Sequence, residues 1–203
     1  MWWSTAKTYK NAIPNELYLE LNAELHNRIT GDTTYLSRAK AEWSWFSHTG
    51  LISASGLIND GLTTACKNNN GTIWTYNQGV VLGGLSDLYL ATGDKTLLTS
   101  AKRTADAAVA NLSSSGILTE PCEATSCDGD QASFKGIFMS GLRKLANTSG
   151  TTAHNSFIAR QSGSIQATDT NTDGQSGLRW TGPFDHPDRG RQSSALAALN
   201  AAS

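Results

Sequence analysis

The sequence predicts an all-α protein built from stacked helical hairpins, and three observations support this fold class. Apolar residues recur at the 3.6-residue spacing of amphipathic helices along most of the chain. A Thr-Gly-Asp turn occurs at residues 30–32 and again at residues 92–94, each time between two predicted helices. Little of the chain has a strand pattern, apart from a short turn or hairpin predicted at Gly56–Leu62.

The predicted helices follow one another with glycine-containing turns or long loops between them. Pro14 suits the first turn of a helix, and leucines at every fourth position continue its apolar face. Gly31 ends this helix, and Asp32 or Thr33 is expected to cap the next. Residues 51–73 form a connection of a length that is usually functional or disordered. The predicted helices are Pro14–Ile29, Thr34–His48, Trp74–Thr92, Lys95–Leu112, Phe134–Leu145, Thr152–Gln166 and Gln192–Ala202.

The helix that begins at Trp74 is predicted to be buried, because it is apolar on nearly every side. Gly79, Gly83 and Gly84 each cost about 1 kcal/mol relative to alanine, so we expect neighbouring helices to approach closely there. Its first turn carries aromatic and amide side chains. This end is either the capped end of a core helix or the wall of a binding site.

An internal repeat links the two Thr-Gly-Asp turns, with an offset of 62 residues. Each unit has a buried helix, a short turn, an amphipathic helix and a long loop, and a degenerate third unit begins at Phe134. Stacked hairpins place the short turns at one end and the long loops at the other. We therefore expect functional residues at the end that carries the long loops.

Composition and motifs exclude several classes of function. The net charge is -1 and there is no basic run, so no nucleic-acid partner is predicted. No apolar run approaches the roughly 20 residues of a membrane span, and no signal-peptide core is seen at the start of the chain. The four histidines are scattered, so neither a metal site nor a cofactor is predicted. Cys122 and Cys127 are close enough in sequence for a local disulfide, which leaves Cys66 without a partner.

Four segments, in this order, resemble glycoside hydrolase family 76, the endo-α-1,6-mannanases, which includes fungal cell-wall relatives. They are Tyr9–Glu16, Gly56–Leu62, Trp74–Gly79, and Glu120–Glu123 with Phe134–Phe138. The resemblance implies an (α/α)6 toroid of twelve helices, of which about seven are present, so residues 1–203 would form the C-terminal part of one domain. It also implies retaining hydrolysis of α-1,6-mannan or a related polysaccharide, and an extracellular or cell-wall location.

The sequence departs from the family at the catalytic residues. The family uses two adjacent aspartates, one as nucleophile and one as acid/base, and the resemblance places them upstream of Trp2. The chain contains no two consecutive aspartates, so no catalytic residue is assigned in it. We therefore expect a fragment, a truncated gene model or a decayed copy, with weak or no hydrolysis. An exposed apolar flank is expected on the first helix, where further helices would pack.

The candidate substrate-binding residues lie in and beside the long loops. Carboxylates and amides there would bind sugar hydroxyls, flat rings would stack on sugars, and a lysine would neutralise an acid. Each has a structural alternative: a solvated loop acid, a helix cap, core packing or a surface lysine. The candidates are Asn11, Asn59, Asp60, Trp74, Tyr76, Asn77, Glu120, Glu123, Asp130 and Lys135.

Three other functions stay open from the sequence. One is a transglycosylase of cell-wall assembly, as in the fungal relatives. Another is a non-catalytic mannan-binding remnant. The third is a helical interaction protein that has no sugar site.

Overall fold

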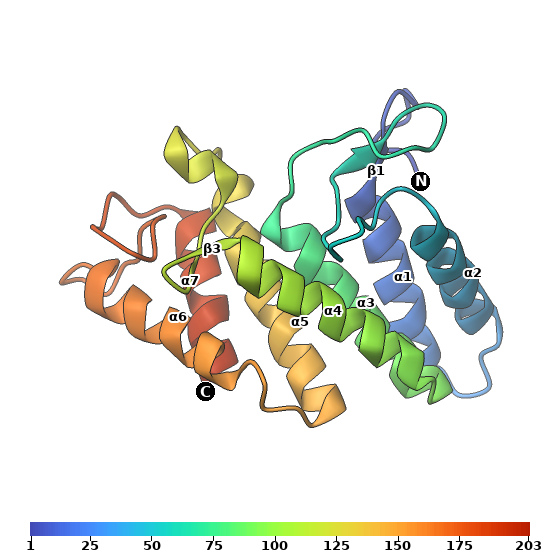
Figure 1. Ribbon diagram of the computed structural model, residues 1–203. Helices are drawn as coiled ribbons and strands as arrows, with labels where there is room; N and C mark the ends of the chain where they lie inside the picture. The colour runs from blue at the N-terminus through green and yellow to red at the C-terminus, as the bar shows by residue number, and fades with distance from the viewer.

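The computed structural model describes residues 1–203 as two layers of helices (Figure 1). The inner layer contains α1, α3, α5 and α7, in which each helix packs on the next. The outer helices α2, α4 and α6 pack against α1, α3 and α7 respectively. This alternation confirms the predicted all-α hairpins. The helices are α1 (Ala12–Arg28), α2 (Thr34–His48), α3 (Thr75–Thr92), α4 (Lys95–Asn111), α5 (Phe134–Ser149), α6 (Asn155–Thr168) and α7 (Arg189–Ala202).

Local sequence explains most of the helix boundaries. The Asp32 carboxylate accepts hydrogen bonds from the backbone N–H groups of Thr34 and Tyr35, and thereby starts α2. Gly93 ends α3 in the left-handed conformation, with a φ of 71°. Helix α5 continues past the expected Leu145 to Ser149, where Gly150 takes the same left-handed conformation.

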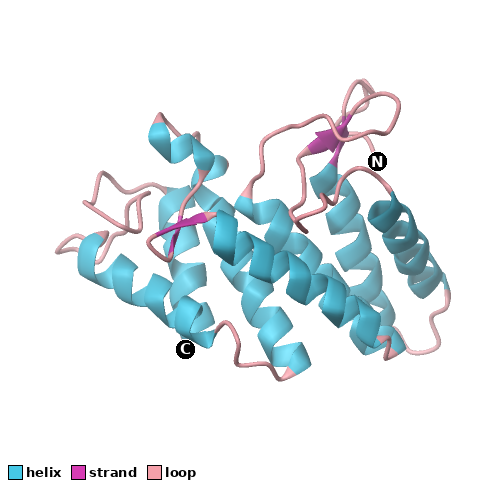
Figure 2. Ribbon diagram, in the orientation of Figure 1, coloured by secondary structure: helices cyan, strands magenta, loops and turns pink.

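The short strands correct one prediction (Figure 2). Residues 56–62 do not form a hairpin among themselves. A turn is closed instead by a bridge between Ile52 and Ile58, and strand β2 (Gly61–Leu62) pairs antiparallel with β1 (Lys10–Asn11). This pairing attaches the N-terminal segment to the first long loop. The second long loop contains β3 (Ser113–Ser114), β4 (Ile117–Leu118) and the 3-10 turns η1 (Pro121–Ala124) and η2 (Gln131–Ser133).

The glycines of the inner layer permit the predicted close packing. A Cβ atom on Gly79 would collide with the backbone of Phe138 in α5, and one on Gly141 would collide with the Gly79 carbonyl. A Cβ atom on Gly83 would meet the Glu20 carboxylate, and one on Gly84 would meet Leu19. Contact between backbones therefore offsets the intrinsic cost of glycine in a helix.

Part of the inner layer is apolar and exposed. Leu17 and Leu21 lie one turn apart on α1 and are 52% and 56% exposed, as expected for the first helix. Leu90 at the end of α3 and Leu196 of α7 are also exposed, at 61% and 47%. No helix combines the length and the apolar character that a membrane span requires.

Candidate functional site

The cavity that collects half of the predicted residues lies where the inner helices begin. Its walls come from the N-terminal segment with β1, the two long loops and the first turns of α3 and α5, and it encloses about 240 Å³. Five predicted residues line it: Asn11, Asp60, Trp74, Tyr76 and Asp130. The other lining residues are Trp3, Tyr9, Asp128, Gln131 and Phe134.

Asp60 is the polar centre of this Asp60 cavity. The Tyr9 hydroxyl donates to its Oδ2 at 2.6 Å, and Asn11 Nδ2 donates to the same oxygen at 3.1 Å. Asn77 Nδ2, from the first turn of α3, approaches Oδ1 at 3.4 Å. The pairing of β1 with β2 brings these groups together, since Asn11 lies opposite Gly61, the neighbour of Asp60. Three neutral donors thus hold a half-buried carboxylate with no cation against it.

Buried groups beneath Asp60 complete its surroundings. Glu16 of α1 is fully buried, and neither of its carboxylate oxygens has a hydrogen-bond partner. Burial, and then repulsion from Asp60, raises the pKa of Glu16 well above its ordinary value, which favours the neutral form of this side chain. Burial and the bond to Asp60 also raise the pKa of Tyr9, which keeps its proton for donation.

Glu16 is not among the residues predicted from the sequence, although the sequence around it carries a signal. The residues around it at helical spacing, Ala12, Leu19 and Ala23, are all fully buried. A glutamate within such a stripe is a buried polar residue, which is more informative than an exposed one. The oxygen atoms of Asn11 and Asn77 are likewise buried and without a donor.

Aromatic rings form the opposite wall of the cavity. The Phe134 ring stacks on Tyr76 with centroids 4.0 Å apart, and Trp74 meets Phe134 edge to face at 5.5 Å. Burial, followed by the nearby Asp60 charge, raises the pKa of Tyr76, so its phenol stays protonated. Phe134 was not predicted as a site residue, because it also marks the start of the apolar helix α5.

Three predicted residues lie outside this wall, in a buried cluster that we call the Lys135 cluster: Glu120, Glu123 and Lys135. Lys135 Nζ lies 2.6 Å from Glu123 Oε1 and donates to the Leu178 carbonyl at 2.7 Å. The Glu120 carboxylate accepts from the Thr75 N–H at 3.3 Å and from the Thr75 hydroxyl. The cluster therefore joins the second long loop to the first turns of α3 and α5 and to the C-terminal loop.

Burial determines the protonation of this cluster. It raises the pKa of Glu120 to about 7, because the bonds from Thr75 only partly offset the lost hydration. Burial also lowers the pKa of Lys135, and the neighbouring Glu123 carboxylate offsets part of this lowering. The predicted disulfide between Cys122 and Cys127 is confirmed and closes the loop beside these acids.

The remaining predicted residue, Asn59, is buried beside the cavity. Its Nδ2 donates to the Gly61 carbonyl and, at 2.7 Å, to Asn69 Oδ1. It therefore holds together the loop that presents Asp60. Asp130 lies at the exposed rim, where its backbone N–H donates to Asp128 Oδ1 at 3.0 Å.

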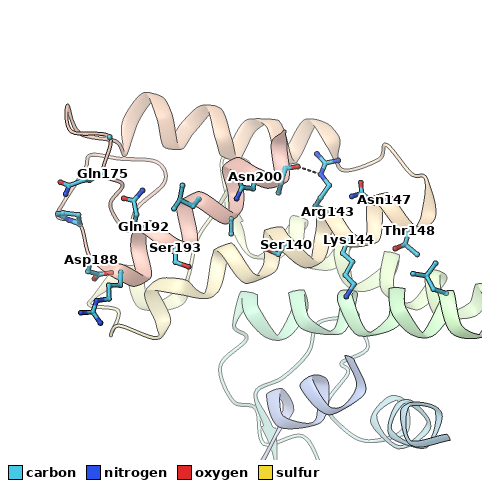
Figure 3. A pocket seen from close by; sticks show the side chains of 17 residues that line it. Ser140, Arg143, Lys144, Asn147, Thr148, Gln175, Asp188, Gln192, Ser193 and Asn200 are labelled. Carbon is cyan, nitrogen blue, oxygen red and sulfur yellow. Dashed lines mark hydrogen bonds between the residues drawn. The ribbon is translucent and has the colours of Figure 1, made fainter. Parts of the chain in front are cut away.

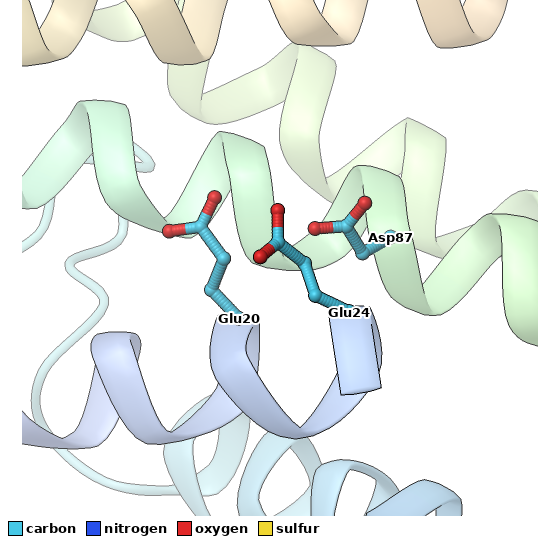
Figure 4. Close-up of side chains that lie close together, drawn as sticks. All are labelled: Glu20, Glu24 and Asp87. Carbon is cyan, nitrogen blue, oxygen red and sulfur yellow. The ribbon is translucent and has the colours of Figure 1, made fainter. Parts of the chain in front are cut away.

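A separate group of acids, Glu20, Glu24 and Asp87, lies between α1 and α3 (Figure 4). Lys144 Nζ lies 3.0 Å from carboxylate oxygens of both Glu20 and Glu24, and it also donates to Asp87. The ammonium group therefore takes the place that a cation would occupy, and the cluster is an ion-pair network between helices.

A groove of about 1380 Å³ lies between α5 and α7 (Figure 3). Ser140, Arg143 and Asn147 of α5 face Gln192 and Asn200 of α7 across it. It contains none of the predicted site residues. The exposed Leu90 and Leu196 form part of its wall.

Comparison with known proteins shows which protein family has this architecture. The model of glycosyl hydrolase family 76 matches residues 1–203. The chain is 34% identical over 152 residues to the mannan endo-1,6-alpha-mannosidase DFG5 of Saccharomyces cerevisiae, covering 70% of this chain and 33% of that protein. It is 30% identical over 208 residues to DCW1 of the same yeast, covering 97% and 46%. The chain thus spans between a third and a half of these relatives.

A solved structure shows the same fold. The GH76A alpha-1,6-mannanase of Salegentibacter sp. HEL1_6 aligns with a TM-score of 0.87 at 24% identity, over all of this chain and 62% of that one. An inactive variant of that enzyme, in which two consecutive aspartates are replaced by asparagine, was solved with alpha-1,6-mannotriose. The seven helices are accordingly part of an (α/α)6 toroid, and the chain belongs to glycosyl hydrolase family 76.

Proposed function

We propose that the Asp60 cavity binds mannose units of α-1,6-linked mannan, as part of a glycosidase of the mannan endo-1,6-α-mannosidase type. One observation carries this proposal: a carboxylate held by neutral donors faces a wall of aromatic rings. A sugar presents hydroxyl groups that donate to carboxylates and C–H faces that pack on rings. The similarity to mannan endo-1,6-alpha-mannosidases supports this choice of sugar. An extracellular or cell-wall location belongs to the same proposal.

In this proposal, Asn59 and the Lys135 cluster hold the binding residues in place and do not contact the sugar themselves. Asn59 supports the loop that presents Asp60. The Lys135 cluster fixes the first turns of α3 and α5, from which Tyr76 and Phe134 form the aromatic wall. Asp130 contacts sugar only at the rim, where it is exposed.

Binding by this chain does not entail hydrolysis. Cleavage of a glycosidic bond ordinarily needs one carboxyl group as acid and a second as nucleophile or base. The sequence has no two consecutive aspartates, and replacing such a pair accompanies inactivity in the Salegentibacter enzyme. We therefore expect the purified 203-residue chain to release few or no reducing ends from α-1,6-mannan. A clear, enzyme-dependent rise in reducing ends would contradict this.

Calorimetric titration with α-1,6-mannotriose tests the binding. We expect Tyr76→Ala and Asp60→Asn each to weaken affinity about 10-fold or more, because hydrogen bonds to a charged group contribute about 1.5–3 kcal/mol. Asp173→Asn is the matched control, because Asp173 is an exposed acid in the loop after α6 and should leave affinity unchanged. Equal affinity in all three variants would refute the site.

Two of the other functions predict different outcomes. A transglycosylase would extend an added acceptor sugar, which product analysis detects directly. A mannan-binding remnant predicts binding of mannotriose with no turnover, the same result that we expect for the purified 203-residue chain. An interaction protein without a sugar site would show no binding that depends on Tyr76.

A further inference from the structure

A second cavity lies on the outer layer, between α2 and α4. It encloses about 450 Å³, within the range typical of small-ligand sites. The first long loop closes one side of it, and no residue is shared with the Asp60 cavity. We call it the α2–α4 groove. Its lining residues are Trp43, Ser47, Ile52, Ser53, Ala54, Gly56, Val81, Thr99, Ser100, Arg103 and Thr104.

Four hydroxyl groups of the groove donate their protons to backbone carbonyls. Thr99 and Ser100 donate to backbone carbonyls one turn earlier in α4, at 3.3 and 3.1 Å. Thr104 donates to the Gly56 carbonyl at 3.0 Å, and Ser47 donates to that of Ser44 at 3.3 Å. A hydroxyl oxygen that has donated its proton can still accept. These four oxygens are therefore acceptors in a wall whose charged donor is Arg103, and a ligand that binds them must supply donors.

The rest of the wall narrows the ligand class further. Trp43 is half-buried and stacked on Phe46, with ring centroids 6.3 Å apart, so it supplies a fixed flat surface. Arg103 donates through Nη2 to the Ala54 carbonyl, which holds its guanidinium at the rim. Gly56 leaves room for this arginine, because a Cβ atom there would lie 3.1 Å from Arg103 Cγ.

From this wall we infer that the α2–α4 groove is a second carbohydrate-binding site, which takes a short segment of a neutral polysaccharide. Sugar hydroxyls donate to the Thr99 and Ser100 oxygens, and a sugar C–H face packs on Trp43. A phosphate or carboxylate would place its negative oxygens against these acceptors, with one guanidinium as the only cation in the wall. A purely apolar ligand would leave the acceptors without donors.

The location gives the site a role separate from the Asp60 cavity. The lining of the α2–α4 groove comes mainly from the outer helices and the first long loop, and the Asp60 cavity lies at the beginning of the inner helices. A long polysaccharide could therefore be held at two points of one chain. The choice of α-1,6-mannan as the sugar rests on the proposed function; the presence of a sugar site does not.

The test is an NMR titration of the wild-type chain with α-1,6-mannotriose, which reports each site separately. We expect shifts in the Trp43 indole N–H and in the amides of Thr99–Thr104, distinct from shifts at Trp74 and Tyr76. Thr99→Val with Ser100→Ala removes two acceptors at nearly constant shape, and should weaken binding at the groove about 10-fold or more. Thr172→Val, an exposed threonine outside both cavities, should change nothing.

The outcomes separate the two sites. Groove shifts that persist in Tyr76→Ala and disappear in Thr99→Val with Ser100→Ala support the second site. No groove shifts at saturation of the Asp60 cavity, or groove shifts unchanged in the double variant, overturn it and leave the Asp60 proposal intact. Groove shifts without any response at Trp74 and Tyr76 support the second site and refute the Asp60 proposal.

Discussion

The Asp60 cavity and the Lys135 cluster both take residues from the second long loop and from the first turns of α3 and α5, yet they use carboxylates in opposite ways. Asp60 is half-buried, opens onto a cavity and is held by neutral donors. Glu123 is buried against an ammonium group at 2.6 Å, and Glu120 is bound to the first turn of α3. A carboxylate whose partners are inside the fold has little capacity left for a ligand, so the partners of an acid indicate its role.

The largest expected effect comes from breaking the buried ion pair. Lys135→Met leaves the Glu123 carboxylate buried without its cation, which should cost about 3–5 kcal/mol of unfolding free energy. Urea denaturation followed by tryptophan fluorescence measures this loss. Lys102→Met removes an exposed pair of similar length, 2.7 Å to Asp106, and should cost about 0–1 kcal/mol. Similar losses of unfolding free energy in Lys135→Met and Lys102→Met would show that the buried ion pair is no more important to the fold than the exposed one.

An intermediate effect is expected from the titration of Glu120. Its pKa of about 7 lies above its ordinary value of 4.5, so the folded state binds a proton more tightly than the unfolded state. The resulting stabilisation is full below the ordinary pKa and is lost as pH rises through about 7. Thermal melts at about pH 5 and about pH 8 should therefore differ more for the wild type than for Glu120→Gln.

The size of this difference sharpens the test. Between about pH 5 and about pH 8, we expect the wild type to lose on the order of 2 kcal/mol more unfolding free energy than Glu120→Gln, or roughly 4–8 °C more in Tm. Burial also raises the pKa of Asp169 to about 7, but Asp169 is present in both proteins and cancels from their difference. If Tm changes equally with pH in the two proteins, a group other than Glu120 causes the pH dependence of stability.

The smallest effect is expected at the rim of the cavity. Asp130 is exposed, and the Ser133 hydroxyl donates to its backbone carbonyl, which the substitution keeps, so Asp130→Asn should change the unfolding free energy by less than about 0.5 kcal/mol. Its effect on mannotriose affinity should stay below about 3-fold, far below that of Asp60→Asn. Calorimetric titration of both variants with mannotriose measures the ratio of their affinities. A larger loss of affinity in Asp130→Asn than in Asp60→Asn would show that the rim, and not Asp60, dominates binding.

Sequence patterns predicted the helices well because their signals are local. Glycine in the left-handed conformation, a capping aspartate and the 3.6-residue apolar period act over one or two turns, as they do at Gly93 and Asp32. The two-residue strands escaped prediction for the opposite reason. The pairing of Gly61–Leu62 with Lys10–Asn11 joins segments about 50 residues apart, and neither segment carries a local signal that specifies its partner.

The sequence by itself determined the helical hairpins, the family and the end of the molecule that carries the long loops. Residue type and spacing also selected Asn11, Asp60, Trp74 and Tyr76, all of which line one cavity. Only the tertiary structure decided which acids face that cavity and which are neutralised inside the fold, and it alone revealed Glu16 beneath Asp60. The physical reason is that the availability of a carboxylate depends on burial and on its nearest donors, and long-range packing supplies both.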